Sequence, residues 1–239
     1  MDKEDALKKL NNILDDLIVN NNSEQQQRYI IGVSGIPGSG KTTFVNQLVK
    51  EFNEQCKTNN KKGYCQEEAC IAVSMDGFHL PKATLDTYPN AKEMHERRGA
   101  YWTFNPTKMI AFLTHLKDTT KKNKDHAIIK APSFDHHIGD PIEDDIIIKP
   151  SHQIIIMDGI YLHLTQPEPW DQVASLLDEK WFIPIDMDEA RLRVSRRHYE
   201  SGLVKSIEEG INRFNRNDIL NAQYILENRD KNVQEIHIN

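Results

Sequence analysis

The stretch GIPGSGKTT, residues 35–43, constrains this chain more than any other part of its sequence. It matches the pattern G-x-x-x-x-G-K-[ST] in full, follows the apolar run YIIGVS at 29–34 and opens a helical pattern. Glycines in such a turn let amide N–H groups point at phosphate oxygens, and a helix N-terminus adds partial positive charge. An ordinary strand-to-helix turn would explain the glycines, but not the lysine and threonine. The motif therefore predicts a site for a nucleoside triphosphate with Mg²⁺.

Each polar group of this loop has an expected role. Lys41 would reach the β- and γ-phosphates as a point charge, and the Thr42 hydroxyl would join the magnesium shell. Other residues expected to bind the nucleotide are Gly35, Pro37, Gly38, Ser39, Gly40 and Thr43. Asp158 ends the apolar run QIIIMD, and a carboxylate there is a second candidate ligand for a hard cation such as Mg²⁺. A helix cap or a turn is the alternative role for Asp158.

Composition limits the other classes of function. The chain of 239 residues is 38% hydrophobic and 28% charged, which predicts a single globular domain over 1–239. Its net charge of −6 disfavours binding to nucleic acid. Its apolar runs are too short to span a bilayer, and its first residues lack the apolar stretch of a signal peptide. Three cysteines without a Cys-x-x-Cys pair predict free thiols, so we expect a cytoplasmic protein.

Apolar periodicity predicts an α/β fold. Leucines and isoleucines at helical spacing predict a helix within 1–22, and apolar runs then alternate with helical patterns. This alternation favours a mainly parallel sheet with helices on both faces. HAIIKA at 126–131 and DDIIIKP at 144–150 are strand candidates, the second at a sheet edge. Ligands bind beyond the carboxyl ends of strands in such sheets, where the glycine loop, Asp76 and Asp158 would meet.

A second group of candidate site residues, Asp76 and His79, follows another predicted strand. The segment SMDGFHLP at 74–81 places Asp76 beside a glycine, with His79 nearby. When a phosphoryl group is transferred to an alcohol, a carboxylate accepts or orients the proton of the attacking hydroxyl, and Asp76 is suited to this role. A turn aspartate before glycine is the alternative. No N-K-x-D motif for guanine occurs in the chain.

Two arginine-rich segments are further candidates. EMHERRGAYWTFN at 93–105 combines cations with aromatics, and Arg97 or Arg98 could bind an anionic group of a substrate. DEARLRVSRRHYESG at 188–202 is a helical pattern with four arginines, of which one or two, including Arg197, could close over a triphosphate. Solvated charges, or surface pairs with neighbouring acids worth tenths of a kcal/mol, are the alternatives in both segments.

Together these motifs make the chain resemble the P-loop kinases that group with uridine kinase, phosphoribulokinase and bacterial-type pantothenate kinase. The resemblance is greatest to pantothenate-kinase-like relatives of nucleoside- or sugar-kinase type, and it covers nearly the whole chain. It rests on GIPGSGKTT, SMDGFHL, ERRGAYWTF, APSFDH, IIIMDGIYL, RLRVSRRHYESGL and NDILNA. It implies the three-layer fold of P-loop NTPases, with a helical lid that we expect at 188–205.

The resemblance also implies roles for single residues. Lys41, Asp76 and Arg197 would be catalytic, with Asp76 as the base and Arg197 in the lid. Residues expected near the acceptor, by similarity or by their place in aromatic-rich segments, are His79, Arg98, Tyr101, Phe104, Phe134 and His136. Relatives usually carry glutamate where this chain has Asp158, so the shorter side chain suggests a metal contact through water or a smaller role. Asn105 stands where pantothenate-type relatives often have aspartate, so pantothenate is not inferred as the acceptor.

We therefore expect a kinase that uses ATP and Mg²⁺ and transfers the γ-phosphate to a hydroxyl of a small metabolite. A nucleoside, a sugar, a vitamin precursor or a hydroxy acid would fit as acceptor. The expected partner is this small molecule rather than nucleic acid or a membrane, and a homodimer would match many relatives. The alternatives are a nucleotide-binding regulatory protein and an ATP hydrolase that needs no acceptor.

Overall fold

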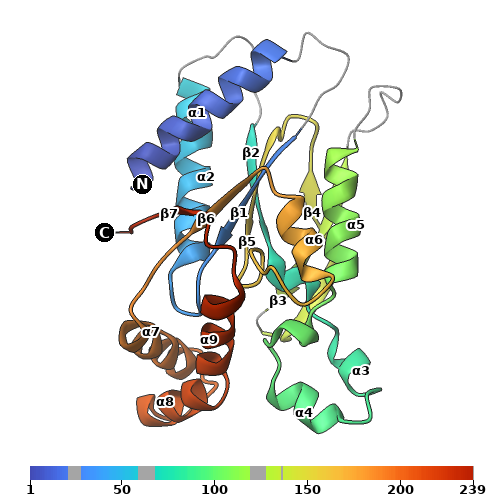
Figure 1. Cartoon of the computed structure of the whole chain (residues 1–239), viewed down its shortest axis with the longest axis vertical. Helices are drawn as coiled ribbons and strands as arrows, with labels where there is room; N and C mark the ends of the chain where they lie inside the picture. The colour runs from blue at the N-terminus through green and yellow to red at the C-terminus, as the bar shows by residue number, and fades with distance from the viewer. Residues whose placement is uncertain (21–27, 59–67, 119–127, 136, 239) are drawn as a thin grey trace.

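A five-stranded sheet forms the centre of the molecule (Figure 1). The structure is a computed structural model that describes residues 1–20, 28–58, 68–118, 128–135 and 137–238. All five strands run parallel, which confirms the expected parallel α/β sheet. In spatial order the strands are β2 (Cys70–Ser74), β5 (Ile154–Asp158), β1 (Tyr29–Ser34), β6 (Glu179–Phe182) and β7 (Gln234–Glu235).

Two further strands form a separate antiparallel hairpin, β3 (Ile129–Asp135) with β4 (Asp140–Ile148). The segment 144–150, for which we expected a strand at a sheet edge, includes the last part of β4, which pairs only with β3 among the described strands and so lies outside the main sheet. The link between β3 and β4 is short, and antiparallel strands can be joined by such a link whereas parallel strands need a long crossover. Gly139, with φ of 71°, lies in this turn.

Helices cover both faces of the sheet (Figure 1). Two long helices pack on one face, and a long and a short helix pack on the other, as the alternating sequence pattern predicts. The first pair is α1 (Lys3–Asn20) and α2 (Lys41–Thr58), and the second is α5 (Pro106–Lys117) and α6 (Trp170–Ser175).

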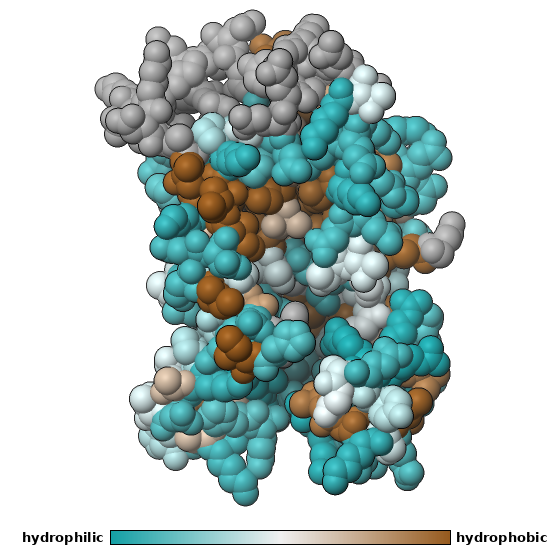
Figure 2. Space-filling model, turned by 180° about the vertical axis from the view of Figure 1, so that it is seen from behind, coloured by the Kyte–Doolittle hydropathy of each residue, from teal (hydrophilic) through white to brown (hydrophobic). Residues whose placement is uncertain are grey.

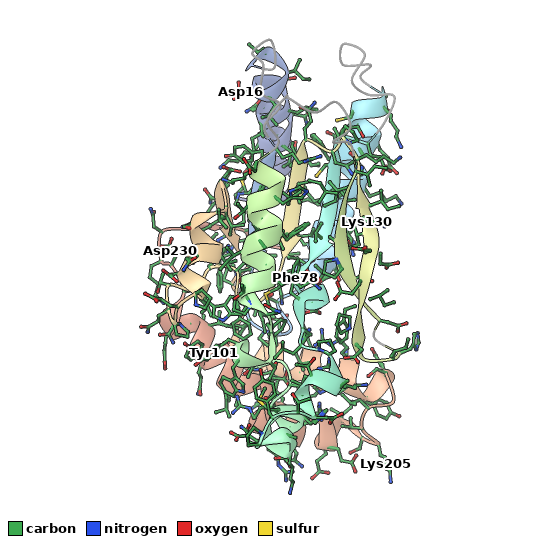
Figure 3. All side chains as sticks on the ribbon, turned by 90° about the vertical axis from the view of Figure 1, so that its right-hand side faces the viewer. Asp16, Phe78, Tyr101, Lys130, Lys205 and Asp230 are labelled. Atoms are coloured by element: carbon green, nitrogen blue, oxygen red, sulfur yellow. The ribbon has the colours of Figure 1, made fainter. Side chains whose placement is uncertain are left out.

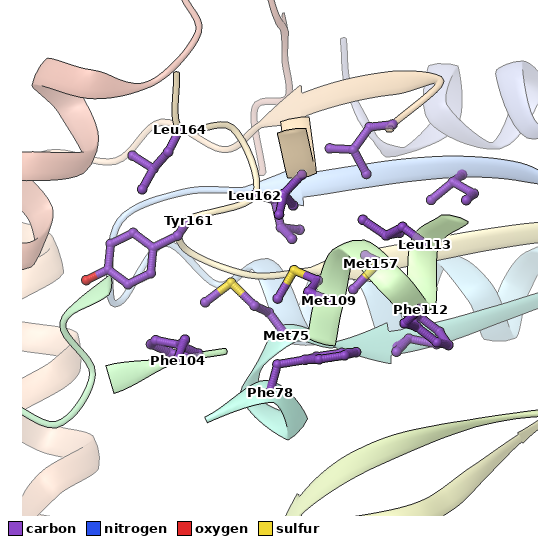
Figure 4. Close-up of a cluster of buried hydrophobic side chains, with 14 of the residues drawn as sticks. Met75, Phe78, Phe104, Met109, Phe112, Leu113, Met157, Tyr161, Leu162 and Leu164 are labelled. Atoms are coloured by element: carbon purple, nitrogen blue, oxygen red, sulfur yellow. The ribbon is translucent and has the colours of Figure 1, made fainter. Parts of the chain in front are cut away.

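The central strands are apolar on both sides, which lets them support two cores. Side chains alternate along a strand, so Ile154 and Ile156 of β5 join the core beneath α1 and α2. Ile155 and Met157 join the opposite core beneath α5 and α6. This second core extends to the carboxyl end of the sheet, where Figure 4 shows Met157 among the methionine and phenylalanine side chains. The strand ends that position polar residues are therefore anchored by apolar packing on both faces.

The remaining helices lie beyond the carboxyl ends of the strands. Figure 1 shows two groups there, α3 and α4 on one side and α7 to α9 on the other. The second group contains the segment for which we expected a lid. The elements are η1 (Met75–Phe78), α3 (Lys82–Leu85), α4 (Ala91–Glu96), η2 (Tyr101–Thr103), α7 (Met187–Glu200), α8 (Ile207–Arg216) and α9 (Asp218–Asn228).

Two other expectations concern the thiols and the membrane. Cys56 and Cys70 are buried thiols that form no disulfide within the described residues, as predicted, and Cys65 lies outside those residues. In the described part of the chain, no helix combines the length and the apolar character needed to cross a membrane.

Gly77 marks a very close approach between η1 and the hairpin. A Cβ atom at this position would lie 2.3 Å from the carbonyl oxygen of Pro132 and 2.6 Å from its carbonyl carbon. These are backbone atoms of β3, so they cannot rotate away as a side chain would. We expect Gly77→Ala to push η1 and the hairpin apart and to cost about 1–3 kcal/mol of stability. Thermal unfolding should show a fall in Tm of roughly 2–4 °C per kcal/mol, and an unchanged Tm would contradict this packing.

Candidate active site

Three neighbouring strands bring the predicted polar residues to one edge of the sheet. In the strand register Asp158 of β5 stands beside Val33 of β1 on one side and Ser74 of β2 on the other. The glycine loop follows β1, and Asp76 lies two residues past Ser74. Because the carboxyl ends of these strands are level, the loop, Asp158 and Asp76 are delivered to one place.

The glycine loop has the backbone shape of an anion cradle. Gly38 and Gly40 have φ of 86° and 83°, the left-handed region that glycine enters without strain. A Cβ atom on Gly38 would lie 2.8 Å from the carbonyl oxygen of Ala190, so α7 packs directly on the loop. The Ser39 hydroxyl is buried, and none of the residues that the structure describes forms a hydrogen bond with it. Helix α2 begins at Lys41, and the first N–H groups of a helix have no partner within it, so they are available to phosphate oxygens.

A compact group of charges lies beside the loop. The Thr42 hydroxyl donates a hydrogen bond of 2.6 Å to Oδ2 of Asp158. Burial raises the pKa of Asp158, and the Thr42 hydrogen bond opposes this shift. Burial lowers the pKa of Lys41 to about 8, while the charges of Asp158 and Asp76 favour its charged form. Lys41 is therefore a desolvated cation whose charged form Asp158 and Asp76 favour, and the phosphates of a bound nucleotide would favour it further.

Thr42 and Asp158 fit a magnesium ion. Their oxygen atoms lie within hydrogen-bond distance of each other, and Mg²⁺ prefers oxygen ligands. Within the described residues, no group of three or more His, Cys, Asp or Glu side chains could hold a metal. Mg²⁺ commonly takes one or two protein ligands together with substrate phosphates and water, so these two residues are a sufficient protein contribution.

A pocket of about 150 Å³ opens among these residues. Its lining includes many residues proposed from the sequence, namely Pro37, Lys41, Thr42, Asp76, His79, Arg98, Phe104, Asp158 and Arg197. It also includes residues that our site prediction omitted, namely Gly99, Gly159, Ile160, Asn217, Asp218 and Asn221. The last three belong to NDILNA, one of the motifs on which the resemblance rests. Asn217 and Asn221 are buried, with 8% and 4% of their surface exposed, and buried amides at a break between two helices are a signal for a site.

The rings of His79 and Phe104 form one wall of the pocket, and Phe134 packs behind His79. The His79 ring lies 3.8 Å from the ring of Phe104 and 4.9 Å from that of Phe134, between centroids. Nδ1 of His79 is 2.9 Å from the backbone carbonyl oxygen of Asp76. This contact and the backbone bond from His79 N to the same oxygen fix the turn that carries Asp76.

Another of the expected acceptor residues, Tyr101, does not line the pocket. Tyr101 stacks its ring on Tyr224 of α9, with 4.7 Å between centroids, so its aromatic face packs on the C-terminal helices. His136 lies outside the described residues.

The adjacent arginines Arg97 and Arg98 have different surroundings. Nη2 of Arg98 donates to Oδ1 of Asp140 at 2.6 Å and to the Leu80 carbonyl oxygen at 3.0 Å. Burial alone would raise the pKa of Asp140, but hydrogen bonds from Arg98 and from the Lys82 amide lower it below its ordinary value. The charge of Arg98 is therefore compensated within the protein, and its contacts tie the hairpin to the 97–105 segment.

Arg197 reaches the pocket from α7, whereas two neighbouring arginines of this helix pair locally. Arg191 lies 3.0 Å from Asp188, and Arg193 pairs with Glu189. Arg197 faces Asp218 across the pocket, where burial raises the pKa of Asp218 to about 6 and the charge of Arg197 opposes the shift. Arg191 and Arg193 of α7 thus form ion pairs at the surface, whereas Arg197 of the same helix lines the pocket.

The model of the phosphoribulokinase/uridine kinase family matches residues 30–231. The chain belongs to this family. A Schizosaccharomyces pombe relative named "Putative uridine kinase C227.14" is 38% identical over 205 residues, which cover 86% of this chain and 81% of that protein. Membership confirms the resemblance inferred from the motifs and makes the chain a P-loop kinase.

Solved structures agree with this membership at the level of the fold. YFH7 of Saccharomyces cerevisiae superimposes with a TM-score of 0.84 at 23% identity, over 100% of this chain and 99% of that chain. D-glycerate 3-kinase of Cryptococcus neoformans gives a TM-score of 0.59 at 13% identity, over 92% and 88%. The three-layer P-loop NTPase fold is thereby confirmed for this member of the phosphoribulokinase/uridine kinase family.

Proposed function

We propose that this chain transfers the γ-phosphate of ATP to a hydroxyl group of a small metabolite. Membership of the family supports the kinase class. The observation that carries the alcohol acceptor is the position of Asp76, which lines the same pocket as Lys41 and Asp158 while following a different strand. A carboxylate beside a phosphate-binding loop is the group needed to take a proton from an attacking hydroxyl.

In the proposed reaction the chain supplies positioning and charge. Amides of the glycine loop and the Lys41 ammonium bind the phosphates, and Asp76 accepts the proton of the acceptor hydroxyl as it attacks. Mg²⁺ held by Thr42 and Asp158 would neutralise charge on the phosphates. Arg197 stabilises the charge that develops on the transferred group. The aromatic wall around His79 limits the access of water, which would otherwise compete with the acceptor.

The segment 188–205 is the proposed lid. It comprises most of α7 and the loop that leads to α8, and it carries Arg197. Figure 3 shows Lys205 of this loop at the lower end of the molecule, far from Phe78 near the strand ends. Closure of such a segment over bound nucleotide would exclude water and reduce hydrolysis of ATP without transfer.

The direct test is acceptor-dependent release of ADP. Purified protein with Mg·ATP should release ADP only when a suitable alcohol is added, and a broad panel of polyols, nucleosides and hydroxy acids will reveal it. ATP turnover that ignores every acceptor would identify a hydrolase, and nucleotide binding without turnover would identify a regulatory protein. A thermal-shift screen with a non-hydrolysable ATP analogue ranks the candidates first, because a ligand at 100 times its Kd stabilises the fold by about 2.7 kcal/mol.

Affinity for ATP should depend on pH above about 8. Burial holds the pKa of Lys41 near this value in the free protein, and bound phosphates favour the charged form, so the complex binds more protons than the free protein. The affinity should therefore be highest below pH 8 and fall as the pH rises through and above it. Calorimetric titration of a non-hydrolysable ATP analogue across pH 6.5–9.5 would measure the trend. A Lys41→Arg variant, whose charge persists over this range, should lose the dependence; the same pH profile in both proteins would contradict the assignment to Lys41.

A further inference from the structure

We propose that the phosphate acceptor carries an anionic group, a carboxylate or a phosphate, and that Arg97, Arg213 and Arg216 bind this group in a second cavity. The inference rests on the proposed kinase function and narrows the class of its acceptor. Three observations support it. The cavity adjoins the catalytic pocket, Arg97 has no carboxylate partner among the described residues whereas Arg98 has one, and the lining of the cavity carries more positive than negative side chains.

The second cavity lies between α4 and α8 and adjoins the catalytic pocket. Its volume is about 590 Å³, and Asn217 lines both cavities. The 150 Å³ pocket around Asp76 falls below the usual 300–1,000 Å³ of a small-molecule site, whereas the second cavity is within this range. Figure 2 shows the lower part of the molecule divided into two lobes with a hollow between them. An acceptor whose hydroxyl lies at Asp76 could thus extend into the larger space.

Arg97 is held in place with donors to spare. Its Nε donates to Oδ1 of Asn217 at 2.9 Å, and its Nη2 donates to Oδ1 of Asn221 at 3.2 Å. The guanidinium also lies over the ring of Trp102, 5.3 Å from its centroid. These contacts use two of the five N–H donors and bring no negative charge. Within the described part of the chain, no carboxylate oxygen lies within 4.0 Å of Arg97.

Arg98, the next residue, differs from Arg97 because it forms an ion pair within the protein. Arg98 is compensated by Asp140 and donates to two backbone carbonyl groups as well. An anion at Arg98 would have to compete with that carboxylate, whereas an anion at Arg97 would meet an uncompensated and already oriented guanidinium. The fork of an arginine matches carboxylate or phosphate oxygens in pairs, so this geometry favours an anionic group over a neutral hydroxyl.

Helix α8 adds two more cations to the same cavity. Arg213 and Arg216 are three residues apart and so lie on the same face of the helix. Neither has a carboxylate oxygen within 4.0 Å among the residues that the structure describes. The two acids of the lining have other neighbours: Glu209 accepts a hydrogen bond from the Lys205 amide at 2.8 Å, and Glu96 lies 3.9 Å from Nζ of Lys92. The cavity therefore has a positive balance of charge.

The experiment compares matched acceptors that differ only in the charged group. Glycerate with glycerol, and ribose 5-phosphate with ribose, separate carboxylate from phosphate recognition, and each is tested for ADP release with Mg·ATP. We expect turnover to favour the anionic member of a pair. Arg97→Gln and Arg213→Gln should each raise KM for that acceptor by roughly 10- to 100-fold, since a hydrogen bond to a charged group is worth about 1.5–3 kcal/mol. KM for ATP should stay within about twofold.

Lys50→Gln is the control. Lys50 is exposed on α2, outside the proposed lid, and lines neither cavity, so the loss of a positive charge there should leave both KM values unchanged. Arg97→Gln also removes contacts to two buried asparagines, so its Tm is measured alongside. If this variant fails to fold, Arg213→Gln decides, because the Arg213 side chain is exposed and outside that amide network.

The outcomes separate this inference from the function on which it rests. If neutral acceptors are phosphorylated as well as their anionic partners, or if the Arg213→Gln variant keeps its KM for an anionic acceptor, the inference is overturned and the kinase function stands. If no acceptor of either class in a broad panel causes ADP release, the proposed function itself is contradicted, and the anionic acceptor falls with it.

Discussion

Asp76→Asn should lower the rate of phosphoryl transfer by roughly 10²–10⁴-fold while leaving the binding of ATP nearly unchanged. An amide has the size of the carboxylate but cannot accept the proton of the acceptor hydroxyl. Asp76 precedes Gly77 in η1, and its carbonyl oxygen rather than its carboxylate receives the bonds from His79, so the turn should survive the substitution. The measurement is acceptor-dependent ADP release, with ATP binding followed by calorimetry on the same preparation.

Asp86→Asn provides the control for this change. Asp86 is an exposed residue at the end of α3 and lines neither cavity, so its amide variant should keep the parent rate. A full rate in the Asp76→Asn variant would mean that another group takes the proton. Loss of ATP binding in that variant would assign Asp76 to the nucleotide rather than to the acceptor.

Removal of the Lys41 ammonium should affect both binding and transfer. In the Lys41→Ala variant we expect the transfer rate to fall by roughly 10²–10³-fold or more, because a desolvated cation aimed at the phosphates is lost. ATP affinity should fall as well, since Asp158 and Asp76 then remain as uncompensated negative charges beside the loop. Single-turnover measurements at saturating Mg·ATP separate the two effects.

The matched substitution is Lys50→Ala, which removes an exposed lysine from the same helix and should leave kinetics unaltered. Retained turnover in Lys41→Ala would remove the glycine loop from the proposed chemistry, whatever the result for Asp76. Because the two substitutions remove a cation and an anion of one cluster, the double variant should lose less than the product of the two single effects.

The parts of the site that could be predicted from sequence are those that a local pattern specifies. The glycine loop needs a strand before it and a helix after it, and residues 29–58 provide both. Strand-end acids such as Asp76 and Asp158 could be placed because level parallel strands deliver their carboxyl ends to one edge. The parallel sheet itself follows from alternating apolar and helical patterns.

The parts that could not be predicted depend on contacts between residues far apart in the chain. Arg97 and Arg98 are adjacent and chemically identical, yet one meets Asn217 and the other meets Asp140. No spacing rule separates these partners, which lie 120 and 42 residues away. The separate hairpin of β3 and β4 was not predicted for a related reason, since the apolar run at 144–150 suits an edge of the main sheet and a hairpin equally. The position of NDILNA beside the pocket likewise depends on contacts of Asn217 and Asn221 with Arg97, which no local pattern predicts.

The contact between Gly38 and α7 bears on how ADP could leave. Ala190 and Val194 lie against this glycine, so the first half of the helix shares the rigidity of the phosphate cradle. If the proposed lid opens, the part that moves must therefore begin after Val194, and Arg197 lies near the start of that part. A small change in this part of α7 would be enough to move the Arg197 guanidinium away from the phosphates. Release of ADP would then require a local rearrangement and not a movement of α7, α8 and α9 together.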